Sequence, residues 1–257
     1  MDFLEINISQ LTLIILIFFV GGTVKGIIGI GMPLIILVST SFFLDIKIAI
    51  PLLLFSILVA NLIQMLEGEH LLSIFNKTKI YFFISLFGIY PGFLVLRYLD
   101  TKYIIIVLGS LIVLNSVLNL FKIVLRTDNH RNFVFQSSLG LMNGFLGGLT
   151  GIYIMPLIFL IQSLRFNKTS IIQMTAMFFF SFGIIQILLF ASHGMITHKV
   201  FLFSCVLCIP VLLGLFFGRF LRKYLNEQSF KRYFNAVLLL MGMVTVAQTM
   251  LNFRIYI

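Results

Sequence analysis

The stretch GGTVKGIIGIGMP at Gly21–Pro33 places a lysine, several glycines and a proline inside an apolar segment. Glycine lets the backbone leave the helix and approach a ligand closely. Pro33 falls where a short new helix would begin, and there its missing N–H group costs little. A helix that starts inside a membrane directs free N–H groups and a positive dipole end at an anion. The residue types and their spacing therefore predict an anion-binding site at a broken helix.

Lys25 adds a positive charge to the same stretch. An intramembrane lysine costs roughly 2.5–3.5 kcal/mol on insertion scales, and such residues usually face a bundle interior or an aqueous cavity. No Asp or Glu lies in the centre of an apolar segment to neutralise it, so a bound anion would be its natural partner. The alternative is a lysine that snorkels towards the interface or stays uncharged in the core.

The glycine pattern recurs at an offset of 122 residues, because GFLGGLTGI at 144–152 matches GTVKGIIGI at 22–30. After one inserted residue, MPLI at 32–35 also recurs at 155–158. Small residues four apart are by themselves a common device for packing membrane helices. The longer pattern, seen twice, indicates an internal repeat. Chance, or an old duplication without a transport role, is the alternative explanation.

The composition excludes a soluble globular domain. Hydrophobic residues make up 60% of the chain and charged residues 10%, with a mean hydropathy of +1.14, whereas soluble domains are roughly half apolar and about a quarter charged. Apolar runs of about 16–23 residues approach or span a hydrocarbon core of about 30 Å. The net charge of +10 does not indicate nucleic-acid binding, because the basic residues lie in short loops, as the positive-inside rule predicts.

Charged residues and Gly/Pro breaks divide the chain into ten elements. They lie near 10–27, 32–44, 47–66, 79–96, 103–121, 133–149, 153–164, 169–191, 200–218 and 233–252. We therefore expect an all-α polytopic membrane protein with about eight full transmembrane helices and two short, broken or re-entrant elements, 32–44 and 153–164. Five elements in each half, about 10–123 and 131–252, would give an inverted repeat, a recurrent architecture of secondary transporters. The whole chain, 1–257, would form one transmembrane domain.

The distribution of Lys and Arg predicts the orientation. One side receives Lys77, Lys79, Lys122, Arg126, Arg131, Arg165, Lys168, Arg219, Arg222, Lys223, Lys231 and Arg232. The other side receives Lys47, Arg97, Lys102, Lys199 and Arg254. The positive-inside rule puts the richer side in the cytoplasm and both termini outside, in a multi-pass protein of the cell membrane.

The two breaks and the span pattern over essentially the whole chain resemble the TauE/SafE family of sulfite exporter-like membrane proteins. The breaks of that family typically read G-x-x-x-G-x-x-G-[IV]-G-G-G or end in G-G-P. The first copy departs from this pattern at Met32, and the second departs at Tyr153, Ile154 and Met155. The resemblance implies a transporter of sulfite, sulfonates, other sulfur oxyanions or small organic anions.

The predicted binding residues lie at the two breaks and on the long element that follows each break. They are Lys25, Gly26, Gly29, Gly31, Gln64, Gly148, Thr150, Gly151, Tyr153 and Gln186. Gln64 and Gln186 fall at the same repeat offset. Interhelical hydrogen bonds, at about 0.6 kcal/mol each, would explain such polar residues without any ligand.

We expect an exporter that works by alternating access, with a small anion and the lipid bilayer as partners and no nucleic acid. An anion channel is the first alternative and a membrane-embedded enzyme the second, although no nucleophile–base constellation is visible. We expect no metal or other cofactor, because no cluster has credible ligand spacing and Cys205 and Cys208 lie in mid-span. The oligomeric state, with a homo-oligomer as one option, stays open.

Overall fold

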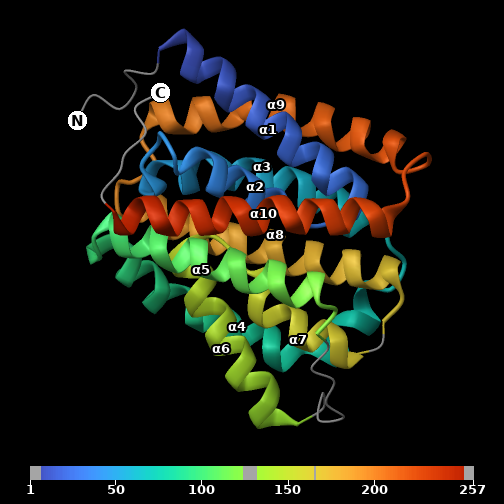
Figure 1. Cartoon of the computed structure of the whole chain (residues 1–257). Coiled ribbons are helices and arrows are strands. Elements are labelled where there is room, and N and C mark those ends of the chain that lie inside the picture. Colours follow the sequence, from blue (N-terminus) through green and yellow to red (C-terminus); the bar gives the residue numbers. More distant parts are fainter. Residues whose placement is uncertain (1–6, 124–131, 165, 252–257) are drawn as a thin grey trace.

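Helices are the regular elements in the part of the chain that the computed structural model describes, residues 7–123, 132–164 and 166–251. In chain order they are α1 (Ile8–Ile28), α2 (Met32–Thr40), α3 (Ile46–Leu66), α4 (Leu71–Tyr98), α5 (Thr101–Leu120), α6 (Phe133–Thr150), α7 (Ile154–Leu164), α8 (Lys168–Ser192), α9 (His198–Leu221) and α10 (Glu227–Met250) (Figure 1). The predicted all-α class is confirmed. Four residues of the charge count lie outside the described residues, namely Arg126, Arg131, Arg165 and Arg254.

Seven of the described helices are long and apolar enough to cross a membrane, which makes the chain a polytopic membrane protein. They are α1, α3, α4, α5, α8, α9 and α10. We expected about eight, but α6 has 18 residues, and Gln136, Asn143 and several glycines make it less apolar. The short elements α2 and α7 have 9 and 11 residues, close to the expected segments.

At each break, fewer residues leave the helix than the sequence predicts. α1 continues through Gly26 to Ile28, and only then do Gly29 and Gly31 adopt φ of 94° and 102°. α6 likewise continues through Gly148 and ends before Gly151, whose φ is 75°. Left-handed backbone of this kind favours glycine because a Cβ atom is disfavoured there. The expectation that Gly26 and Gly148 belong to irregular backbone is therefore wrong.

Two helices begin earlier than the apolar runs indicate. α4 starts at Leu71 rather than near 79, and α10 starts at Glu227 rather than near 233. The side-chain oxygen of Asn226 caps α10 by accepting hydrogen bonds from the backbone N–H groups of Gln228 and Ser229. A cap of this kind stabilises a polar first turn. Boundaries drawn from hydropathy alone miss such turns.

α1 packs along α9 through small residues on both helices. The glycines at this contact are Gly22 and Gly26 in α1 and Gly214 and Gly218 in α9. A Cβ atom at these glycines would overlap a backbone carbonyl oxygen of the other helix, belonging in the same order to Val211, Leu215, Phe19 and Thr23. Residue numbers rise together along both helices, so α1 and α9 run parallel. Close backbone approach through glycines is a common way to pack helices in membranes.

α6 packs along α4 in the same way. The glycines are Gly144 and Gly148 in α6 and Gly88 and Gly92 in α4. The carbonyl oxygens that a Cβ atom would overlap belong in the same order to Ser85, Ile89, Leu141 and Phe145. Every residue of α6 in this contact lies 122 positions after its counterpart in α1, and every residue of α9 lies 126 positions after its counterpart in α4.

α3 and α8 lie between these two helix pairs and run antiparallel to each other (Figure 1). Gln173, near the start of α8, donates hydrogen bonds to the carbonyl groups of Met65 and Gly68 at the end of α3. Further along α8, Gly183 lies beside Leu58, which is earlier in α3. Opposite directions of the third helix in each half are what the predicted inverted repeat would give.

Candidate functional site

Lys25 lies in the last turn of α1 and is 2% exposed. Its Nζ atom donates a hydrogen bond of 2.7 Å to Oδ1 of Asn61 in α3. The side-chain amide of Asn61 in turn donates to the carbonyl oxygen of Ile57. Lys25 is the one charged side chain that is buried in the described part of the chain. The structure therefore gives this cation a neutral partner instead of a carboxylate.

An ion pair lies close to the same end of α1. Arg219 of α9 donates two hydrogen bonds to the carboxylate of Glu67, from Nη1 at 2.5 Å and from Nη2 at 2.9 Å. The backbone nitrogen of Arg219 also lies beside Gly26. The bidentate geometry is the strong form of this pair. The pair joins the end of α3 to α9. Because Glu67 pairs with Arg219, the side chain that contacts the ammonium of Lys25 is the neutral Asn61.

The first break is surrounded by apolar side chains. Gly29 caps α1 through a hydrogen bond of 2.7 Å from its N–H group to the carbonyl oxygen of Lys25. A Cβ atom at Gly29 would contact Ile172, and one at Gly31 would lie 3.1 Å from Phe234. α2 begins after Gly31 without a side-chain cap. The uncapped start is consistent with the predicted anion-binding helix end, but its neighbours are hydrophobic.

The second break is held by its own polar groups. The hydroxyl of Thr150 donates to the carbonyl oxygen of Leu146 at 2.7 Å and accepts a hydrogen bond of 3.2 Å from the N–H group of Ile152. The N–H group of Gly151 donates to the carbonyl oxygen of Gly147 at 2.7 Å. The hydroxyl of Thr150 is thus hydrogen-bonded to backbone groups on both sides of the break and is not directed at an open site.

Tyr153 and Gln186 both contact Gly147. Nε2 of Gln186 donates to the carbonyl oxygen of Gly147 at 3.2 Å, and the ring of Tyr153 occupies the space that a side chain at Gly147 would need. The ring packs against Phe179 and Phe182, with centroids 6.1 and 4.9 Å away. Both predicted site residues are buried, and the structure brings them together.

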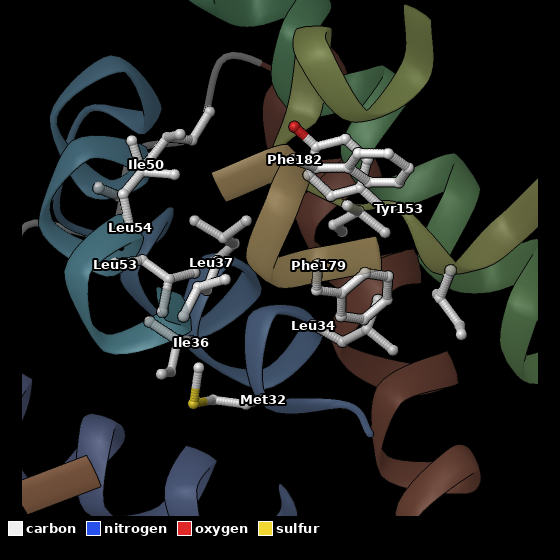
Figure 2. Close-up of a cluster of buried hydrophobic side chains, with 14 of the residues drawn as sticks. Met32, Leu34, Ile36, Leu37, Ile50, Leu53, Leu54, Tyr153, Phe179 and Phe182 are labelled. Carbon is white, nitrogen blue, oxygen red and sulfur yellow. The ribbon is translucent and has the colours of Figure 1, made fainter. Parts of the chain in front are cut away.

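The centre between α2 and the second break is apolar. Figure 2 shows Leu34 and Phe179 in the space between Met32, at the start of α2, and Tyr153. These side chains belong to one buried hydrophobic cluster. Among the described residues, the two breaks that we predicted to bind an anion are thus separated by apolar side chains and do not share one polar site. Gly26 and Gly148 correspondingly pack against α9 and α4.

Almost the whole chain matches one family model, described as Sulfite exporter TauE/SafE, over residues 13–245. The chain belongs to the TauE/SafE family. Membership implies a membrane transporter of sulfur anions and agrees with the predicted resemblance and with a chain that is not an enzyme. Comparisons with curated proteins and with solved structures found no match.

Two polar residues of this TauE/SafE chain were not among the predicted site residues. Asn61 is the partner of Lys25. Asn143 in α6 is fully buried, and neither atom of its amide has a hydrogen-bond partner in the described residues. In the sequence, an asparagine one turn before a glycine-rich break was the signal that could have identified Asn143. Gln64 is 5% exposed, and its Oε1 atom has no partner in the described residues either.

Proposed function

We propose that this chain exports a small anion, such as sulfite, a sulfonate or another sulfur oxyanion, across the cell membrane by alternating access. The family match supports a transporter of sulfur anions. The observation that carries the proposal is the buried ammonium of Lys25, which is held by the neutral amide of Asn61 at 2.7 Å. A neutral partner leaves the charge uncompensated, so an anion would stabilise Lys25 more than Asn61 does.

Burial of the predicted site favours a carrier over a channel. Lys25, Gln64, Tyr153 and Gln186 are all at most 5% exposed, so an anion reaches them only if helices move. Movement of this kind is what alternating access requires. An inside-negative membrane potential favours outward movement of an anion by about 2.3 kcal/mol per charge and 100 mV. Export could thus proceed without a coupled ion.

The test is Lys25→Ala, with Lys47→Ala as the matched control. Lys47 is also a hydrogen-bonded lysine, since its Nζ atom donates to the carbonyl oxygens of Arg97 and Leu99, but it lies outside the proposed site. We expect Lys25→Ala to weaken sulfite binding at least about tenfold, because a hydrogen bond to a charged group contributes about 1.5–3 kcal/mol.

Sulfite uptake into proteoliposomes is the measurement. We expect saturable flux from the wild type and from Lys47→Ala, and strongly reduced flux from Lys25→Ala. Unchanged flux in Lys25→Ala would remove Lys25 from the site. A current that grows in proportion to voltage without saturation would favour the anion channel instead.

A further inference from the structure

Three polar side chains of the second half surround Gly147. Gln186 reaches it from α8 by the hydrogen bond to its carbonyl oxygen, and Tyr153 covers it from the break. Asn143 lies one helical turn before Gly147 on the same face of α6, since residues four apart are neighbours on a helix. None of the three is more than 4% exposed. Together they form a buried polar group, to which the proposed function assigns no joint role.

The orientation of the Gln186 amide follows from its partner. A backbone carbonyl oxygen can only accept, so the atom that contacts Gly147 must be the NH2 group. The Oε1 atom of Gln186 therefore points elsewhere as an acceptor, and it has no hydrogen-bond partner among the described residues. An acceptor in this position needs a ligand that can donate a hydrogen bond.

Tyr153 and Asn143 supply the complementary groups. Within the part of the chain that the structure describes, the hydroxyl of Tyr153 is buried without a partner, as are both amide atoms of Asn143. A tyrosine hydroxyl and an asparagine NH2 group donate hydrogen bonds, which suits the oxygens of an anion. Buried polar side chains in proteins are normally paired, so several unpaired ones around one glycine indicate a binding site.

The position of this group in the repeat strengthens the inference. Gly147 is the counterpart of Lys25, and Gln186 is the counterpart of Gln64, at the same offset of 122 residues. The first half thus has a cation next to Asn61, whereas Asn143, Tyr153 and Gln186 at the matching place in the second half are neutral donors and acceptors.

We infer that Asn143, Tyr153 and Gln186 form a neutral hydrogen-bonding site for a monoanionic sulfur oxyanion that itself carries a hydrogen-bond donor, such as hydrogen sulfite. The inference rests on the proposed function and specifies its substrate. The donors of Tyr153 and Asn143 bind the oxygens of the anion, and Oε1 of Gln186 accepts a hydrogen bond from the donor group of the ligand. A dianion is disfavoured because none of the three side chains offers a compensating charge.

The first experiment removes single polar groups and measures the thermal stabilisation of the purified protein by sulfite at mildly acidic pH. Tyr153→Phe and Gln186→Leu are expected to weaken sulfite binding about tenfold. Ser116→Ala is the matched control, because Ser116 on α5 also has a buried hydroxyl without a partner. The control should keep the full sulfite response.

The melting temperature without ligand separates binding from structure. Loss of an unpaired buried hydroxyl should leave the ligand-free melting temperature of Tyr153→Phe unchanged or raise it. If Tyr153→Phe showed a smaller sulfite response together with a lower ligand-free melting temperature, the result would point to a structural role of Tyr153 and overturn the inference. Full sulfite responses in both Tyr153→Phe and Gln186→Leu would overturn it as well.

The second experiment tests the requirement for a donor with two monoanions that differ by one hydroxyl. 2-Hydroxyethanesulfonate should stabilise the wild type more than ethanesulfonate does, and Gln186→Leu should lose this preference. Equal responses to the two sulfonates, including no response to either, would overturn the donor requirement. A wild type that neither binds nor transports any sulfur anion would instead contradict the proposed function itself.

Discussion

Lys25 and Gly147 are counterparts in the repeat, and their surroundings explain why only one of them can be a lysine. Tyr153 fills the space next to Gly147, whereas at the first position Asn61 offers an oxygen 2.7 Å from the ammonium. A buried ammonium without a partner is costly, so Lys25 and Asn61 depend on each other. The two halves thus share glycines but differ in the polar groups that would meet an anion.

This dependence predicts non-additive changes in stability. Asn61→Leu removes the acceptor of Lys25 and should destabilise the protein by about 1–3 kcal/mol. Lys25→Met in the Asn61→Leu background should recover most of that loss, because no buried charge remains. Thermal unfolding in detergent measures Asn61→Leu, Lys25→Met and the double variant. Additive effects of the two substitutions would mean that the Lys25–Asn61 hydrogen bond does not stabilise the closed arrangement.

At the scale of elements, the glycine contacts explain why the chain folds as two matching helix pairs. α1 approaches α9, and α6 approaches α4, closely enough that helix backbones touch. Side chains at these positions would separate the helices and thereby displace the breaks that follow them, at Gly29 and Gly151. The glycines that looked like parts of a binding loop in the sequence therefore act through helix packing.

Gly26→Ala and Gly148→Ala are expected to destabilise the protein by about 1–3 kcal/mol each, as overpacking in a tight contact does. The reason is that a Cβ atom would overlap the carbonyl oxygens of Leu215 and Ile89, which cannot move separately from their helices. Gly183→Ala is the matched control in α8, where the nearest atom is a side-chain methyl group of Leu58 at 3.0 Å. Melting temperatures in detergent distinguish the three variants.

If Gly26→Ala and Gly148→Ala lower the melting temperature no more than Gly183→Ala does, the helix pairs tolerate a wider spacing. Such a result would return these two glycines to consideration as flexible parts of the site.

Sequence reasoning reached the helices and breaks but not the partners of the site residues. Hydropathy and glycine spacing identified α2 and α7 as short elements, because those signals are local. The contact of Lys25 with Asn61 joins residues 36 positions apart, and it depends on how α1 and α3 pack. The role of Gly26 was missed for the same reason, since α9 lies far from it in the chain.

At the scale of the whole molecule, the ion pair of Glu67 and the hydrogen-bonded Lys47 lie at opposite ends of α3. Arg219 pairs with Glu67, and Glu227 at the start of α10 pairs with Lys168 and Lys231. All the basic residues of these pairs belong to the side predicted to be cytoplasmic. Lys47, assigned to the other side, donates to backbone carbonyl groups. The charge asymmetry that predicts orientation is therefore also an asymmetry in contacts, with ion pairs on one side and hydrogen bonds from Lys47 to carbonyl groups on the other.

The predicted orientation can be tested with matched single cysteines. Ser192→Cys, at the end of α8, and Ser229→Cys, in the first turn of α10, are both exposed and isosteric changes. They would be made after replacing Cys205 and Cys208, of which the first is exposed. The positive-inside rule places position 192 outside the cell and position 229 in the cytoplasm.

A membrane-impermeant maleimide applied to intact cells should therefore label Ser192→Cys and leave Ser229→Cys unlabelled until the membrane is permeabilised. The chain without cysteines serves as the background control. The opposite labelling pattern would place both termini in the cytoplasm and put the ion pairs of Glu67 and Glu227 on the outer side. Under the proposed export by alternating access, those charged contacts would then lie on the side to which the anion is released.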